Sequence, residues 1–69
     1  MNLQWEEGFT ISVDIDRNTA VIRANREGLL SLAKHLASLA EEAPGSHIHF
    51  DEYNSLEEGS ADLIVERIR

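Results

Sequence analysis

The sequence contains no cysteine among its 69 residues. Disulfide bonds and thiolate zinc sites are therefore excluded as supports for the fold, and cysteine usage does not indicate the redox compartment. A domain of this length buries only about 60% of the surface of its unfolded chain. We therefore expect a single domain, residues 1–69, that depends on its apolar core, has little room for a buried catalytic cleft and holds no cofactor.

Long apolar runs and an excess of basic residues are also missing. No segment approaches the roughly 18 apolar residues of a membrane-spanning helix. The segment "MNLQWEEGF" lacks the regions of a signal peptide, so we expect a cytoplasmic protein without a membrane partner. Thirteen acidic and six basic residues give a net charge of −7. This charge disfavours nucleic acid as a partner and favours a basic protein if charge guides association.

Residues 9–24, "FTISVDIDRNTAVIRA", alternate apolar and polar side chains with the two-residue period of a strand. Arg17 and Asn18 interrupt the pattern, and Asn tolerates the positive φ of a tight turn. A two-residue turn brings the apolar sides of the two strands together by three pairings: Ile15 with Ala20, Val13 with Ile22, and Ile11 with Ala24. The segment therefore predicts a β-hairpin.

Residues 25–45, "NREGLLSLAKHLASLAEEAPG", change to the period of a helix. Asn25 is the expected N-cap, and Pro44-Gly45 supplies the stop. The apolar side chains form one broad arc: Leu29, Leu30, Leu32, Ala33, Leu36, Ala37, Leu39 and Ala40. We expect this arc, Leu36 included, to face the core and His35 to lie at its boundary.

Two further strands are indicated after the helix. In "GSHIHFDE", residues 45–52, Ile48 and Phe50 point to one side, and His47, His49 and Asp51 point to the other. The segment "SLEEG", residues 55–59, has capping-box spacing and predicts a helical turn in the connection. The final "ADLIVERIR" is apolar on both sides, which favours a strand inside a sheet.

The predicted fold is α+β with the order β-β-α-β-β, in which one amphipathic helix packs on a four-stranded sheet. The first and last strands are the most apolar, so we place them in the centre. This gives the strand order 2-1-4-3, which resembles the β-grasp arrangement. The alternative is a 1-2-3-4 sheet with its second and third strands parallel.

The pair His47 and His49 raises the possibility of a metal site. Histidines two residues apart on one strand can bind one ion, with Asp51 or a carboxylate of the last strand as a third ligand. The same alternation is typical of a strand face exposed to solvent or to a partner. The sequence has no glycine-rich phosphate loop and no recognisable nucleophile, so we expect neither an enzyme nor a metal protein, and we keep a His47–His49–Asp51 module as the alternative.

Two surfaces are candidates for binding a partner. The first is the acidic segment "DEYNSLEE", residues 51–58, because tyrosine often dominates interface affinity and carboxylates speed encounter with a basic partner. Its candidate residues are Asp51, Glu52, Tyr53, Leu56, Glu57 and Glu58. The alternative is a solvated connector with Leu56 tucked under the helix. The second surface is the open sheet face, where Val21 and one side of the last strand would meet a partner or a second copy beside His49.

Four segments, "ANREGLLSLAKHLASLA", "GSHIHFDE", "NSLEEGS" and "LIVER", together resemble a family of small α+β immunity proteins. These proteins are encoded beside toxins in bacterial polymorphic toxin systems, and the resemblance covers residues 24–67. It implies a cytosolic, non-catalytic protein that binds and neutralises a cognate toxin, and it carries no map of toxin-binding residues. A metal-dependent module and a homodimeric regulatory or interaction domain remain as alternatives.

Overall fold

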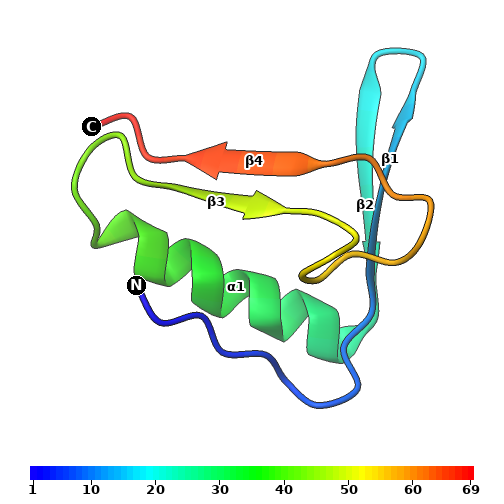
Figure 1. Ribbon diagram of the computed structural model, residues 1–69, viewed down its shortest axis with the longest axis horizontal. Helices are drawn as coiled ribbons and strands as arrows, with labels where there is room; N and C mark the ends of the chain where they lie inside the picture. Colours follow the sequence, from blue (N-terminus) through cyan, green and yellow to red (C-terminus); the bar gives the residue numbers. More distant parts are fainter.

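A computed structural model describes residues 1–69 and contains one helix and four short strands (Figure 1). In chain order these are β1 (Ile11–Asp16), β2 (Thr19–Ala24), α1 (Arg26–Ala40), β3 (His47–Phe50) and β4 (Leu63–Glu66). The predicted α+β class and the β-β-α-β-β order are confirmed. Helix α1 falls short of the length and hydropathy needed to cross a membrane.

Strands β1 and β2 form the predicted antiparallel hairpin. The observed register pairs Ile15 with Ala20 and Val13 with Ile22. The loop residues Arg17 and Asn18 have φ angles of 49° and 70°. Two successive positive φ angles are typical of the turn whose twist matches that of a two-stranded hairpin.

Helix α1 begins where the sequence indicates. Asn25 is extended and its Oδ1 accepts a hydrogen bond from the Gly28 amide at 2.7 Å, which satisfies one of the free amides of the first turn. The same oxygen accepts from the Thr10 amide at 3.0 Å. Asn25 therefore caps the helix and also joins it to the chain entering β1.

The side of α1 that faces the core differs from the prediction. The buried positions are Gly28, Ser31, Leu32, His35 and Leu39. Leu29 and Leu36 remain 57% and 45% exposed, so the expectation that the whole apolar arc faces the core is wrong. His35 is fully buried rather than at the boundary, and only the Leu32–Leu39 edge of the arc reaches the core.

The N-terminal segment explains why the buried side of α1 includes Ser31 and His35, because it covers both residues. The Glu6 amide donates to Ser31 Oγ at 2.8 Å, and His35 Nε2 lies 2.8 Å from the Gln4 carbonyl oxygen, which can only accept. Figure 1 shows the segment running back along α1. Ser31 Oγ and His35 Nε2 thus have hydrogen-bond partners that lower the cost of their burial, whereas the buried His35 Nδ1 has none.

An aromatic cluster fixes this segment to the core. The Trp5 ring stacks on Phe9 with 4.5 Å between centroids and meets His35 edge-on at 4.2 Å. Phe50 of β3 closes the cluster, 6.0 Å from His35 and 6.3 Å from Trp5. These separations lie within the range of favourable aromatic pairs, and the cluster adjoins the seven-residue apolar core: Ile11, Val13, Leu32, Leu39, Ile48, Phe50 and Leu56.

The structure contains two separate two-stranded sheets, β1–β2 and β3–β4, and so does not confirm a single four-stranded sheet of either predicted order. The outer edge of β1 is occupied by the segment that leads into β4, not by β4 itself. The amides of Glu57 and Ala61 donate to the carbonyl oxygens of Ile11 and Val13, each at 2.8 Å. With its edge used in this way, β1 cannot also pair with β4.

Strand β4 is consequently an edge strand rather than an interior one. Its partner β3 lies on one side, and Leu63 and Val65 pack against the core. Ile64 points outward and is 59% exposed, which corrects the expectation that apolar residues on both sides place this strand inside a sheet. The far half of the hairpin also projects from the core, and Ile22, which pairs with Val13 on the apolar side of the predicted hairpin, is exposed.

Candidate functional site

The acidic loop, residues 51–58, forms a tight turn built on Asp51. The side-chain oxygen Oδ1 of Asp51 accepts hydrogen bonds from the amides of Tyr53 at 2.9 Å and Asn54 at 3.1 Å. Its carbonyl oxygen accepts from the amides of Ser55 at 3.0 Å and Leu56 at 2.8 Å. The helical turn expected at residues 55–59 is therefore replaced by a turn that Asp51 caps earlier in the chain.

Further contacts hold both ends of the acidic loop. The Asn54 side-chain amide donates to the His49 carbonyl oxygen at 2.8 Å, and the Glu52 carboxylate accepts from the Gly59 amide at 2.6 Å. Ser55 and Leu56 are buried, and Leu56 belongs to the apolar core. The loop is thus anchored in the core through Leu56, as the solvated-connector alternative expected for that residue.

Tyr53 lies at the tip of this anchored turn with 97% of its surface exposed. The hydrogen bonds to Asp51 fix its backbone, so the ring is displayed without any packing partner within the chain. A rigid aromatic side chain offers contact area at a small cost in conformational entropy. The acidic loop therefore presents Tyr53 in a form suited to binding.

The charge around Tyr53 has one sign. Glu52, Glu57 and Glu58 are exposed, Asp51 is partly buried, and no basic residue occurs between positions 51 and 58. Neighbouring carboxylates on an exposed loop create a negative local potential, which attracts a basic surface. The acidic loop is therefore electrostatically matched to a cationic partner.

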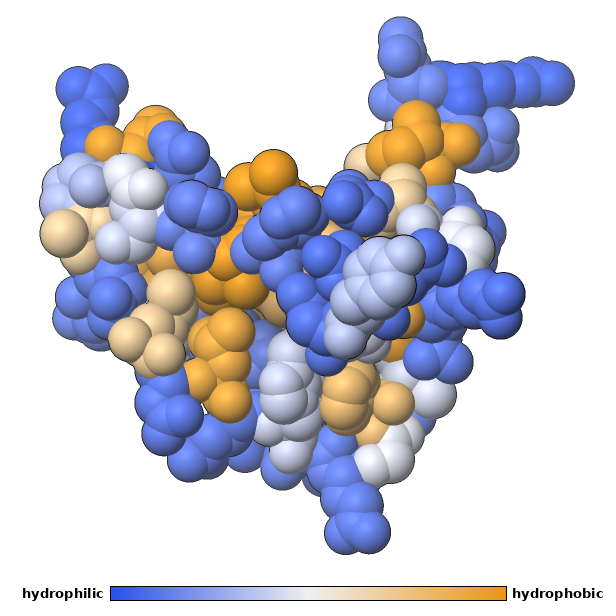
Figure 2. All heavy atoms as spheres, in the orientation of Figure 1, coloured by the Kyte–Doolittle hydropathy of each residue, from blue (hydrophilic) through white to orange (hydrophobic).

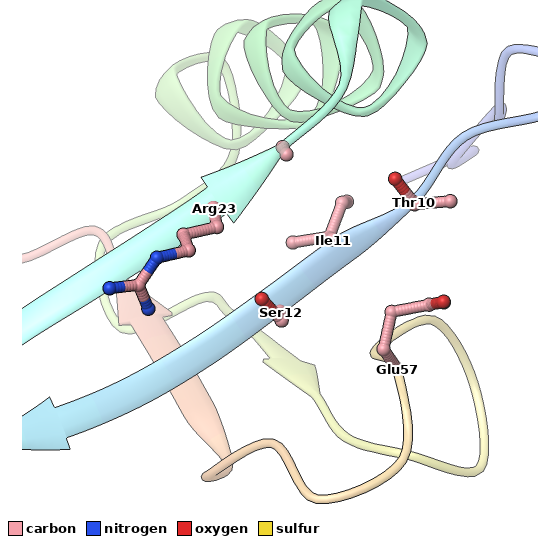
Figure 3. Close-up of a pocket in the computed structure, with 6 residues that line it drawn as sticks. Thr10, Ile11, Ser12, Arg23 and Glu57 are labelled. Carbon is pink, nitrogen blue, oxygen red and sulfur yellow. The ribbon is translucent and has the colours of Figure 1, made fainter.

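An open hollow of about 360 Å³ lies next to the acidic loop. It is lined by Thr10, Ile11, Ser12, Arg23, Ala24 and Glu57. Figure 3 shows Arg23 on β2 and Glu57 on the loop, on opposite sides of β1. Arg23 pairs with Asp14 at 2.7 Å, and both side chains are largely exposed. Glu57 is the one carboxylate that lines the hollow, so it is the group there that can pair with a cation.

The histidines take different places from those of the predicted metal trio. His47 and His49 are both exposed on the outer side of β3. Ligand atoms of His49, Asp51 and Asp62 lie within 4.8 Å of one another, and His49 Nε2 is 3.0 Å from Asp62 Oδ2. The structure thus groups Asp62, instead of His47, with His49 and Asp51.

Sequence reasoning allowed a carboxylate of the last strand as a ligand but did not single out Asp62, because the position of Asp62 depends on strand pairing. Phe50 pairs with Leu63, so the residues just outside this pair, Asp51 and Asp62, meet at the end of the β3–β4 sheet. The proximity of Asp51 and Asp62 can be inferred only once the register of β3 and β4 is known.

The second predicted surface is divided by the fold. Val21 is half-buried on β2, whereas the outward side of β4 belongs to the other sheet. One continuous open sheet face that joins Val21 to the last strand is therefore not present. Val21 shares its side of the hairpin with Asp14, directly opposite in the register, and with Arg23.

Comparison with known proteins gives one finding. The family model described as Immunity protein 32 matches residues 19–68, which include β2, α1, β3, the acidic loop and β4. No curated protein and no solved structure shows a significant match. The matched range contains most of the chain and all of residues 51–58.

Proposed function

The chain belongs to the Immunity protein 32 family, and from this we propose that it binds a cognate bacterial toxin and neutralises it without catalysis. It acts in the cytoplasm of the cell that produces the toxin. The family match carries the immunity function, and the surface around Tyr53 supports the choice of binding site. The earlier resemblance to immunity proteins is thereby confirmed.

The acidic loop is the proposed centre of the toxin interface. Tyr53 is fully displayed while Leu56 holds the loop in the core. Hot spots of protein interfaces are enriched in tyrosine and are surrounded by contacts that exclude water. Tyr53 would supply the anchor, and Asp51, Glu52, Glu57 and Glu58 would surround it with charge for a basic toxin.

The hollow beside Glu57 extends this interface onto the hairpin. A lysine or arginine side chain of the toxin would lie over β1 with its cationic end at the Glu57 carboxylate (Figure 3). Val21 and the exposed histidines His47 and His49 are proposed as margin contacts. A charged pair at such a margin contributes mainly to encounter rate and orientation.

A small metal-binding module is the second candidate function, favoured by the grouping of His49, Asp51 and Asp62. Asp51 is oriented by two backbone amides, as carboxylate ligands of metals often are. Calorimetric titration with zinc and nickel tests this candidate. One tightly bound ion, lost in His49→Ala and retained in His47→Ala, would favour it, and identical folding in chelator with no binding heat would exclude it.

Expression of the toxin encoded beside this gene tests the proposed function directly. In a susceptible bacterial strain, induction of the toxin alone should arrest growth, and co-expression of this chain should restore it. The two purified proteins should then co-elute as a complex. Growth arrest that persists despite soluble, folded chain would contradict an immunity role.

A further inference from the structure

Helix α1 leaves part of its apolar arc without a partner. The α1 stripe, defined as Leu29, Ala33, Leu36 and Ala40, is exposed at all four positions, next to the buried edge formed by Leu32 and Leu39. In Figure 2, apolar side chains lie among hydrophilic ones on the face where the N-terminal segment runs along α1. Two leucines about half exposed on one helix face are costly to leave in water, so a covering surface is favoured.

The spacing of the α1 stripe fits a second helix. Positions 29, 33, 36 and 40 are separated by four, three and four residues, the alternation of the two apolar positions in a helix pair. Leucine and alanine also alternate along the stripe. In an antiparallel copy of the same helix, Leu29 faces Ala40 and Ala33 faces Leu36, so each large side chain meets a small one.

The charges at the ends of α1 favour the same arrangement. Arg26 and Glu27 lie in the first turn, and Glu41 and Glu42 follow the last turn, which contains no basic residue. The helix dipole opposes Arg26, Glu41 and Glu42 at their own ends. An antiparallel second copy brings the neutral Arg26–Glu27 pair of one chain beside Glu41 and Glu42 of the other, whereas a parallel copy would bring the four carboxylates together.

Arg26 is free to make this contact. Its only ion pair is with the adjacent residue Glu27 at 3.4 Å, and 79% of the Arg26 side chain is exposed. Pairs between such exposed groups contribute little within one chain. Its long side chain can therefore turn toward a neighbouring helix without loss of a structural contact.

We propose that the α1 stripe binds a second copy of this chain in an antiparallel helix pair. The acidic loop takes no part in the stripe, so dimerisation and toxin binding are separate properties of the molecule. One pair of 15-residue helices lies at the low end of interface size, which favours a dissociation constant in about the micromolar range.

Sedimentation equilibrium over a wide concentration range tests this proposal. The wild-type chain should shift from monomer to dimer as concentration rises. Leu36→Glu and Ala33→Glu should each raise the dissociation constant at least about 10-fold, and the second variant removes no buried side chain. Ile64→Glu, an equally exposed apolar position on β4, is the matched control and should dimerise as wild type.

Charge exchange tests the antiparallel geometry. Arg26→Glu should weaken the dimer, and the double variant Arg26→Glu/Glu41→Arg should restore it, because the opposite charges face each other again. A wild-type chain that stays monomeric throughout would overturn the proposal. If that monomer also lost toxin binding on Leu36→Glu, the stripe would belong to the toxin interface, and the proposed function would stand without the dimer.

Discussion

Gly28 illustrates how a single residue sets the approach of two elements in this fold. A Cβ atom at this position would clash with the carbonyl oxygen of Thr10 and lie 3.0 Å from the side chains of Ile11 and Ala24. The start of α1 can therefore rest against β1 and β2 only because residue 28 has no side chain. Glycine lowers the stability of the helix at this position but allows the close packing.

We expect Gly28→Ala to destabilise the protein although alanine is the better helix former. The propensity gain of about 1 kcal/mol is smaller than the cost of overpacking, about 1 to 3 kcal/mol. Urea denaturation measures the difference, with the exposed Ala33→Gly as a control for propensity in the same helix. Increased stability of Gly28→Ala would show that α1 does not approach β1 this closely.

Local residue chemistry was predictable wherever its cause lies within a few positions. The Arg17-Asn18 turn and the Asn25 cap were both predicted, because turn and cap preferences depend on the neighbouring backbone. The burial of Ser31 and His35 was not predictable, since their partners lie 25 and 31 residues away in the N-terminal segment. The proximity of Asp62 to Asp51 could be inferred only from the strand register.

At the scale of elements, α1 shows why periodicity alone does not fix which face is buried. Its apolar arc is wider than the core can cover, so the position of the N-terminal segment decides which edge is enclosed. Trp5 in that segment carried no periodic signal in the sequence, and Phe9 fitted the alternation of the first strand. The separation of the two sheets likewise depends on hydrogen bonds from Glu57 and Ala61 to β1, which strand patterns do not indicate.

Truncation of Leu39 and truncation of Leu36, on the two edges of the arc, should lower folding stability by different amounts. Leu39 is 3% exposed, so Leu39→Ala should cost about 2 to 5 kcal/mol, a large share of the stability of so small a domain. Leu36→Ala removes the same atoms from an exposed site and should cost less than about 1 kcal/mol. Chemical denaturation of dilute samples gives both values, and equal losses would mean that the helix is rotated.

At the scale of the whole molecule, the net charge of −7 acts together with the placement of the acidic loop. A uniform negative charge mainly maintains solubility. Charges concentrated around an exposed anchor instead guide a basic partner to that anchor. A measurement can separate general charge from local guidance. General charge depends only on how many carboxylates are changed, whereas guidance depends on whether they lie in the acidic loop.

Reversal of charge in the loop should slow the association of the toxin. Glu57→Lys/Glu58→Lys should lower the association rate about 3- to 10-fold at low salt, and the loss should shrink once the Debye length falls to about 10 Å near 0.1 M. Glu7→Lys/Glu66→Lys makes the same change in net charge outside the loop and serves as control. Stopped-flow association rates that fall equally in both variants would indicate general charge alone.

The most direct measurement is the dissociation rate of the toxin complex formed by Tyr53→Ala. Tyr53 makes no packing contact within the chain, so its removal should leave folding stability unchanged. If the ring is the anchor of the interface, the variant should lose about 2 kcal/mol of binding free energy, mainly as an approximately 30-fold faster dissociation. Ile68→Ala, which also truncates an exposed apolar side chain, should dissociate at the wild-type rate. A Tyr53→Ala complex as long-lived as the wild type would contradict the assignment of the acidic loop as the toxin-binding site.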